Sequence, residues 1–539
     1  MILDAKERER LAQRARELFA AEPVDYAAAV PVLRQAAALG DPWCLCTLGW
    51  CCEFGQGTEK DMEQALWLYE QGAQQEFAPA QCNLAVLYIT GKGVAKDEEQ
   101  GVALLRPAAQ QNFARAQYLL GCMYQEGRGV EQNAAKAAAC FNDAAFLGYA
   151  AAQFSLGVCY ERGRGVEQNF DTALHQYLKA AAQNHVAAIY NVGYFYEMGL
   201  GVEKDEAKAA EYYARAAEQG DADAECSLGW CYDTGTGVER DSRKAVELYE
   251  KAAKKGQLRA MHNLAWCYRM AQPGADGPDR KEQAIKWFRR AANGGYTSSL
   301  CDLGVCYQEG WGVEQDLAHA IDLYRQCANQ GLGKAMDCLG QCYRDGEGVE
   351  KDLDEALRWF EQGAEAGHPE AQFHAAWFWD EGLTGQQDSR RAVHWYTALL
   401  EQNLPGRQCW SDGVNNLAEC YRYGRGVEKN LQKAEELYQL AGRCGNDMAW
   451  YNLGHLYQEE KQDLKTAARY YTKGVEECTQ GGDCALALAL LHEKGQGVPQ
   501  DSEEALRLAR LALERAGDDQ QVIDDAQALL GRLESQPDC

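Results

Sequence analysis

One short phrase recurs thirteen times in this chain of 539 residues, almost always 36 residues apart. Two clear copies are LGVCYERGRGVEQN at 156–169 and LGQCYRDGEGVEKD at 339–352. A fixed period of this length predicts an array of stacked units, each too small to fold alone, and not a set of globular domains. The second position of the phrase is always glycine or alanine, and it marks the thirteen units: Gly49, Ala85, Gly121, Gly157, Gly193, Gly229, Ala265, Gly304, Gly340, Ala376, Ala418, Gly454 and Ala489.

The unit at residues 221–256 shows how one repeat is built. Leu228 and Cys231 belong to an apolar set spaced by three and four residues, which predicts a first helix, here called helix A. We expect helix A to end at Gly235, because glycine readily adopts the left-handed conformation of a C-terminal cap. Asp241 follows in the N-cap position of a second helix, helix B, whose apolar residues have the same spacing.

The same capping position holds Asp or Asn in nearly every unit. These residues are Asp61, Asp97, Asn133, Asn169, Asp205, Asp241, Asp316, Asp352, Asp388, Asn430 and Asp501. Neither helix can cover its own apolar face, so a unit is expected to be stable only against its neighbours. The small residue of the phrase, Gly229 in this unit, is expected to permit a close approach of helices that a larger side chain would block.

The chain is strongly acidic, with 54 Lys and Arg against 81 Asp and Glu and a net charge of −27. Such a surface repels phosphate backbones, so we expect no nucleic acid partner and favour a protein or peptide partner of basic character. The N-terminus is charged from its fourth residue, and no run of 18 apolar residues occurs. These features predict no membrane association and a cytoplasmic location.

Twenty-two cysteines are present, and seven of them share the slot two residues after the small residue of the phrase: Cys51, Cys159, Cys231, Cys267, Cys306, Cys342 and Cys420. In the other six units this slot holds only apolar residues. Cysteine is therefore predicted to act here as a small hydrophobe with a reduced thiol. Paired CxxC knuckles are absent from the sequence, so neither a metal nor another cofactor is expected.

The phrase LG, the turn GxGV, the capping Asp or Asn and the KA-x3-Y of helix B occur together in unit after unit. This combination resembles the Sel-one-like repeat family, relatives of the tetratricopeptide repeats, over roughly residues 25–512. The resemblance implies an all-α fold, a right-handed α/α superhelical solenoid of about thirteen helix pairs in which helix A lines the concave side. It also implies a role as an adaptor or scaffold for other proteins.

Three regions are expected along the chain: an N-terminal helix in 1–24, the repeat array in 25–512, and a capping helix and tail in 513–539. The period is broken near 270–280, 403–413 and 457–463. Long loops often hold function or allow bending, but we favour the simpler interpretation that these breaks are tolerated surface insertions.

If helix A faces inward, the slots three before and one after the small residue point into the groove. Aromatic residues occupy ten of these positions: Trp50, Tyr118, Phe154, Tyr190, Tyr194, Trp230, Trp266, Phe373, Trp377 and Tyr451. We interpret them as a track that binds the apolar anchors of an extended or helical peptide. The alternative is that the rings pack between neighbouring helices A as part of the core.

Charged residues accompany this track in the slot four places after the small residue. The acidic members are Glu53, Glu161, Glu197, Asp233 and Asp380, and the basic members are Arg269, Arg344 and Arg422. We expect the acidic residues to bind basic groups of a ligand, with the sign reversed toward the C-terminal half.

An enzyme is not expected. Some cysteine-rich relatives carry a β-lactamase label, but the Ser-x-x-Lys, SDN and KTG elements of that hydrolase chemistry are absent here. A self-assembling structural protein is a further alternative, which polar helices at both ends disfavour. The sequence therefore predicts a monomeric, non-catalytic scaffold that binds a protein along its helices A.

Overall fold

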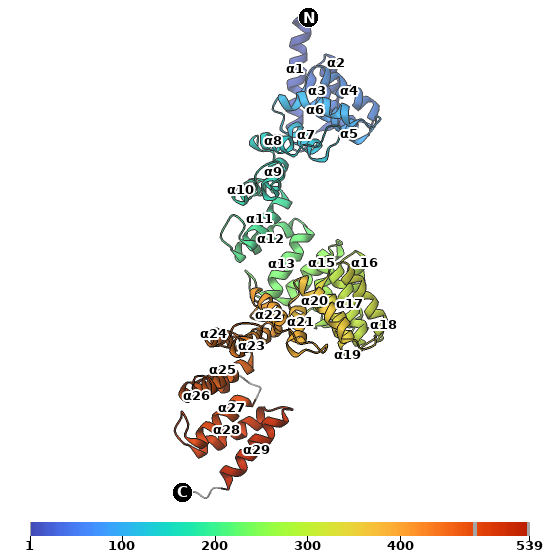
Figure 1. Cartoon of the computed structure of the whole chain (residues 1–539). Helices are drawn as coiled ribbons and strands as arrows, with labels where there is room; N and C mark the ends of the chain where they lie inside the picture. The colour runs from blue at the N-terminus through green and yellow to red at the C-terminus, as the bar shows by residue number, and fades with distance from the viewer. Residues whose placement is uncertain (1, 478–481, 536–539) are drawn as a thin grey trace. The chain divides into compact units, whose positions relative to one another are not determined.

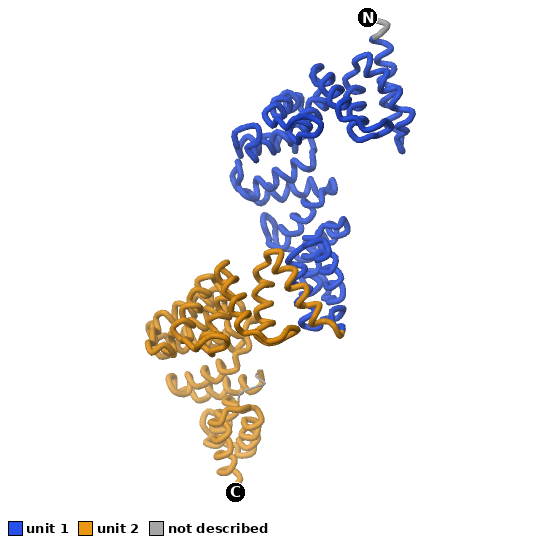
Figure 2. The backbone as a smooth tube through the Cα atoms, turned by 90° about the vertical axis from the view of Figure 1, so that its right-hand side faces the viewer, with its two compact units in different colours: residues 1–277 blue, residues 278–539 orange. Residues whose placement is uncertain are grey.

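The computed structural model describes residues 2–477 and 482–535, and these residues form 29 α-helices and no strand (Figure 1). The chain separates into two compact units, Met1–Gly277 and Pro278–Cys539 (Figure 2). The division lies inside the first predicted break of the period. Within each unit, every helix packs against the next one along the chain.

The first unit begins with α1 (Ile2–Phe19) and α2 (Tyr26–Ala38), and α2 is a helix B without a helix A. Its helices A are α3 (Pro42–Phe54), α5 (Ala78–Thr90), α7 (Ala114–Glu126), α9 (Ala150–Arg162), α11 (Val186–Met198), α13 (Ala222–Thr234) and α15 (Leu258–Arg269). Its further helices B are α4 (Met62–Gln74), α6 (Glu98–Gln110), α8 (Ala134–Phe146), α10 (Phe170–Ala182), α12 (Glu206–Glu218) and α14 (Ser242–Lys254).

The second unit begins with a helix B and ends with the predicted capping helix, α29 (Gln520–Glu534). Its helices A are α17 (Thr297–Glu309), α19 (Gly333–Asp345), α21 (Pro369–Glu381), α23 (Gln408–Tyr423), α25 (Asp447–Glu459) and α27 (Asp483–Lys494). Its helices B are α16 (Arg280–Asn293), α18 (Leu317–Asn329), α20 (Leu353–Glu365), α22 (Ser389–Glu401), α24 (Leu431–Arg443), α26 (Leu464–Glu477) and α28 (Ser502–Arg515). Part of the predicted insertion at 403–413 is thus helical, because it lengthens α23 at its N-terminus.

The turn after helix A uses both of its glycines. Gly235 has a φ of 78° and caps α13 by donating its N–H to the carbonyl of Cys231 at 2.9 Å. Gly237 has a φ of 72°, and a Cβ there would lie 2.0 Å from the carbonyl oxygen of Glu206 in α12. The first glycine therefore ends the helix, and the second allows the turn to lie directly on helix B of the preceding repeat.

The predicted caps of helix B are confirmed at all eleven positions. At Asp241, for example, Oδ1 accepts a hydrogen bond from the backbone N–H of Lys244 at 3.1 Å. Asp463 caps α26 in the same way, although its turn has lost the GxG pattern. At α16, by contrast, Asp279 makes no side-chain capping bond.

Where the small residue of helix A is glycine, an aromatic ring of helix B in the same repeat covers it. A Cβ on Gly229 would lie 2.8 Å from the ring of Tyr249, and a Cβ on Gly157 would lie 2.5 Å from the ring of Tyr177. Carbon atoms at van der Waals contact are about 3.5–4.0 Å apart, so a side chain at these positions would displace the ring. The expected close approach is confirmed, and it occurs between the two helices of one repeat.

The seven cysteines of the shared slot are all buried, as predicted. Burial raises the pKa of the Cys231 and Cys342 thiols to about 12. The twenty cysteines that the structure describes are free thiols. The slot is therefore a core position in which cysteine packs like a small apolar side chain.

Candidate functional site

The ten aromatic residues of the predicted track all retain some exposure to solvent. Tyr194 and Trp230 are exposed, with 38% and 40% of their surface accessible. The other eight are half-buried: Trp50, Tyr118, Phe154, Tyr190, Trp266, Phe373, Trp377 and Tyr451. Both exposed members belong to the slot that follows the small residue.

Rings in the slot three before the small residue extend the core. The ring of Phe154 lies 5.7 Å from that of Tyr177 in its own helix B and 4.8 Å from that of His185, just before the next helix A. Tyr118 likewise lies 5.3 Å from Tyr149 at the start of the following repeat. These rings connect one repeat to the next and leave only part of their surface to a ligand.

The acidic residues predicted to face a ligand have a different role. The hydroxyl of Tyr69 in α4 donates to Glu53 at 2.9 Å, and Tyr177 and Tyr213 donate in the same way to Glu161 and Glu197. A buried hydroxyl needs an acceptor, and this slot supplies it within the repeat. The prediction of a ligand-facing acidic row is therefore corrected for these three carboxylates.

The two other acidic residues are bound by the turn of the following repeat. Nε2 of Gln272 donates to Asp233 at 2.9 Å, and the guanidinium of Arg425 lies 3.6 Å from Asp380. The ammonium of Lys92 binds Glu53 in the equivalent manner at 2.7 Å. These contacts join consecutive repeats, and they occupy carboxylates that were predicted to bind a ligand.

The predicted reversal of sign is also corrected, because the three arginines of this slot have partners within the chain. Arg344 donates two hydrogen bonds to the neighbouring aspartate, and Arg422 is buried and donates to Nδ1 of His455 at 2.8 Å. The guanidinium of Arg269 lies 5.4 Å from the ring centre of Trp266. These arginines are therefore engaged inside the chain.

An aromatic hollow lies where the N-terminal helices of the first unit meet its first repeats. Its volume is about 420 Å³, and it is lined by Phe19, Tyr26, Trp43, Cys46, Thr47, Trp50, Phe77, Pro79 and Asn83. Phe19 contacts Tyr26 and Trp43 edge-on at 5.7 and 6.0 Å, and the ring of Trp50 lies 6.4 Å from that of Tyr26. The rings hold one another in place, so the hollow is formed before any ligand binds.

Two guanidinium groups lie close to this hollow. That of Arg16 is 5.4 Å from the ring centre of Trp43, and Arg115 donates to Oδ1 of Asn83 at 2.8 Å. Of the lining residues, the sequence predicted only Trp50. Phe19 and Tyr26 precede the first complete repeat, so the periodic pattern gave no reason to place them beside it.

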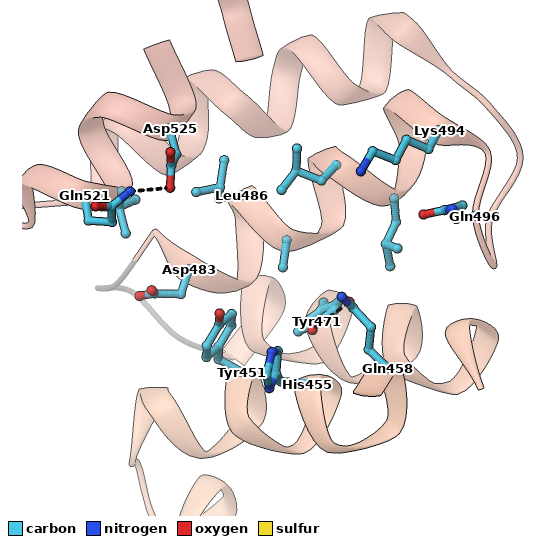
Figure 3. Close-up of a pocket in the computed structure, with 14 residues that line it drawn as sticks. Tyr451, His455, Gln458, Tyr471, Asp483, Leu486, Lys494, Gln496, Gln521 and Asp525 are labelled. Atoms are coloured by element: carbon cyan, nitrogen blue, oxygen red, sulfur yellow. Dashed lines mark hydrogen bonds between the residues drawn. The ribbon is translucent and has the colours of Figure 1, made fainter. Parts of the chain in front are cut away.

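A second hollow, of about 310 Å³, lies in the second unit between α25, α26, α27 and α29 (Figure 3). Leu486 and other apolar residues of α27 line it together with Tyr451, a predicted track residue. Asp483 and Asp525 lie toward the α29 side in Figure 3, and burial raises the pKa of Asp483. The lining is thus more polar than that of the aromatic hollow.

Two structural features are absent from residues 2–477 and 482–535. No helix there is long and apolar enough to cross a bilayer. No group of three or more His, Cys, Asp or Glu residues there is arranged to hold a metal ion.

Comparison with known families identifies the repeat. A model of the Sel1 repeat matches thirteen successive segments: 45–77, 78–113, 114–149, 150–185, 186–221, 222–257, 258–296, 297–332, 334–368, 369–404, 411–446, 448–477 and 482–516. Proteins of this kind generally act through protein–protein interaction and are generally non-catalytic.

Known proteins and structures of similar sequence contain the same repeat. A protective antigen of uropathogenic Escherichia coli with an SLR fold is 28% identical, over 95% of this chain and 98% of that chain, with a TM-score of 0.60. A Sel1 repeat protein of Oxalobacter formigenes is 30% identical over 47% of this chain and 100% of its own, with a TM-score of 0.42.

A shorter similarity links the chain to a plant protein. A segment of 66 residues is 33% identical to the ERAD-associated E3 ubiquitin-protein ligase component HRD3B of Arabidopsis thaliana, and it spans 12% of this chain and 11% of that protein. The thirteen family matches cover most of the chain and coincide with the thirteen units of the sequence period. The chain therefore belongs to the Sel1 repeat family.

Proposed function

We propose that the chain is a non-catalytic scaffold that binds a protein or peptide through aromatic residues of its helices A, with the aromatic hollow of the first unit as an anchor site. One observation carries this proposal: five aromatic rings surround an open hollow of about 420 Å³. Aromatic side chains that remain accessible and preformed are the residues that dominate protein–protein contacts.

The other members of the predicted track extend this surface. Tyr194 and Trp230 are the most exposed of them and stand in the same slot as Trp50. An extended or helical peptide would place one apolar side chain in the hollow and further ones on rings of this slot. The general behaviour of Sel1 repeat proteins supports a protein partner.

We expect the net charge of the chain to select the charge of the partner. A net charge of −27 favours basic segments of a partner and disfavours nucleic acid. Arg16 and Arg115 are the local exceptions at the hollow. Peptides with the same apolar anchor but basic or acidic flanks would separate the general effect from the local one.

The experiment is a peptide-library selection on the immobilised full chain, followed by affinity measurements on the selected peptides. The variants Trp43→Ala and Trp50→Ala are expected to weaken binding roughly 30-fold each, the effect of removing a central anchor contact of about 2 kcal/mol. Trp67→Ala is the matched control, because Trp67 is a 55% exposed tryptophan on helix B, outside the hollow.

Three outcomes distinguish the hypotheses, once circular dichroism has shown equal helicity. Equal losses in Trp67→Ala would mean that the hollow is not the site. Loss only in the triple variant Trp230→Ala, Trp266→Ala and Trp377→Ala would place binding on the wider track. Light scattering that increases with concentration without any selected peptide would favour the self-assembling alternative.

A further inference from the structure

Helix α16 has a charge opposite to that of the rest of the chain. Its sequence RKEQAIKWFRRAAN contains five basic residues and one acidic residue, in a protein whose net charge is −27. Three of the basic side chains, Lys286, Arg289 and Arg290, are exposed. The first helix of the second unit is therefore a local source of positive potential on an acidic molecule.

These three cations border a groove on the second unit. It has a volume of about 510 Å³ and is lined by Glu282, Ile285, Lys286, Arg289, Arg290 and Asn293 of α16 and by Gly312 and Val313 of the turn after α17. Ile285 is buried and Val313 half-buried, so both contribute apolar wall. The groove combines an apolar side with a row of cations.

The cations of the groove lack the carboxylate partners that helix B usually provides. Among the residues of 2–477 and 482–535, none of the three forms an ion pair: Arg289 donates to the hydroxyl of Tyr307 at 2.9 Å, and Arg290 lies 5.4 Å from the ring centre of Trp287. Other helices B pair an exposed cation with a carboxylate one turn away, as in Lys208 with Asp205 at 2.9 Å, Arg358 with Glu355 at 3.0 Å and Arg507 with Glu504 at 2.6 Å. Glu282 lies one turn before Lys286 and can offset at most one of the three charges.

We infer that the α16 groove binds a short acidic segment of a partner protein, in which carboxylates contact Lys286, Arg289 and Arg290 and an apolar side chain lies against Ile285 and Val313. Charge complementarity carries the inference, because none of the three cations forms an ion pair with a carboxylate among the described residues of an otherwise acidic protein. This surface is separate from the aromatic hollow and does not depend on the function proposed for it.

The electrostatics of the surrounding chain favours a short segment over an extended polyanion. At physiological salt, charges act over a Debye length of about 8 Å, so a few carboxylates in the groove respond mainly to α16. A nucleic acid strand or an anionic bilayer would extend far beyond that distance, over a molecule with 81 acidic residues. The apolar wall adds affinity for a peptide side chain that neither phosphate nor a nucleic acid backbone supplies.

The test measures fluorescence anisotropy of labelled short peptides with the full chain. An alternating glutamate–leucine peptide is the probe, and its lysine–leucine and glutamate–serine counterparts, an oligothymidylate and phosphatidylserine vesicles are compared with it. The glutamate–leucine peptide is expected to bind at least about tenfold more tightly than each of these, and its affinity should fall as salt is raised.

Charge reversal of the groove is compared with an equal reversal elsewhere in the second unit. The variant Lys286→Glu with Arg290→Glu is expected to lose at least about tenfold in affinity for the glutamate–leucine peptide. The control, Arg325→Glu with Arg358→Glu, changes the net charge equally on α18 and α20 and should leave binding unchanged. Equal loss in both variants, or no loss in either, would overturn the site. The assignment to an acidic, apolar segment would be overturned if oligothymidylate, vesicles or the glutamate–serine peptide bound equally tightly at the same residues.

Discussion

At the scale of single residues, the slot four places after the small residue of helix A determines whether a tyrosine hydroxyl of helix B has a hydrogen-bond acceptor. Glu197 accepts the hydroxyl of Tyr213, sixteen residues further on. Where helix B carries Leu105 in place of tyrosine, the same slot holds Ile89, so this repeat has neither the hydroxyl nor the acceptor. Opposite Arg422, the hydroxyl of Tyr438 is buried without an acceptor in the described structure. The acid and the tyrosine form one unit of packing.

This pairing predicts a specific energetic coupling. Glu197→Leu leaves the Tyr213 hydroxyl buried without an acceptor, at an expected cost of about 1–3 kcal/mol in the free energy of unfolding. Tyr213→Phe in the same chain should recover part of that cost, because no hydroxyl then remains to satisfy. A double-mutant cycle from urea denaturation measures the coupling, and strictly additive effects would contradict it.

The ring that covers the small residue predicts a cost for any large substitution there. In Gly229→Leu the new side chain meets the ring of Tyr249, and the overpacking should lower the free energy of unfolding by about 1–3 kcal/mol. Gly531→Ala in α29 is the matched control, since a Cβ there contacts nothing within 4 Å. The control should be neutral or stabilising by up to about 1 kcal/mol. An unchanged urea midpoint for Gly229→Leu would disprove the packing model.

The buried thiols predict loss of stability at alkaline pH. In the folded chain the pKa values of Cys231 and Cys342 are raised from 9.0 to about 12 by burial. Between these values the folded chain holds protons that the unfolded chain releases, so the free energy of unfolding falls as pH rises, by up to about 1.4 kcal/mol per pH unit for each thiol. Urea denaturation across this range should give a shallower fall for Cys231→Ala with Cys342→Ala than for the wild type. Identical slopes would argue against the thiols as the cause.

At the scale of the secondary-structure element, the N-cap of helix B predicts a graded effect. Asp241 accepts a backbone N–H at 3.1 Å, so Asp241→Ala should cost about 1 kcal/mol. Asp279 stands before α16 without such a bond to a backbone N–H. Asp279→Ala should cost clearly less, because it removes only an exposed hydrogen bond from Nε2 of Gln283 at 3.1 Å and the interaction of the charge with the helix dipole. Thermal or urea denaturation measures the loss in the free energy of unfolding for both variants. Equal losses would mean that charge, not the capping bond, stabilises these helices.

The period of the sequence was sufficient for the helices and their caps but not for the contacts between them. Spacing and turn residues place Asp241 and Gly235 correctly, because both act through local backbone geometry. The spacing along helix A predicts that Glu197 binds a ligand, because it does not reveal that Tyr213 of the next helix donates its hydroxyl to this carboxylate. The aromatic hollow was missed for a related reason: Phe19 and Tyr26 reach Trp50 only through the packing of segments that lie outside the repeat.

At the scale of the whole molecule, the division into two compact units predicts where a protease cuts first. The segment 270–279 between α15 and α16 begins with Met270, which is 61% exposed, and contains two prolines and two glycines. Limited proteolysis should therefore yield two stable fragments, each about half of the 59.8 kDa chain. Replacing the segment with a regular GxGV turn should slow this cut, and a first cut elsewhere, such as at 403–407, would contradict the expectation.

The ring that covers Gly229 and the hydroxyl bond that satisfies Tyr213 each lie within a single span from the start of helix A to the end of helix B. We call such a span a cassette. Unequal recombination that duplicates or deletes one cassette moves the glycine together with its ring and the hydroxyl together with its acceptor. Between cassettes the turn side chains Lys92, Gln272 and Arg425 make the same kind of contact with different chemical groups. Length can therefore vary among descendants of one ancestral gene, by whole cassettes, without altering the interior of any of them.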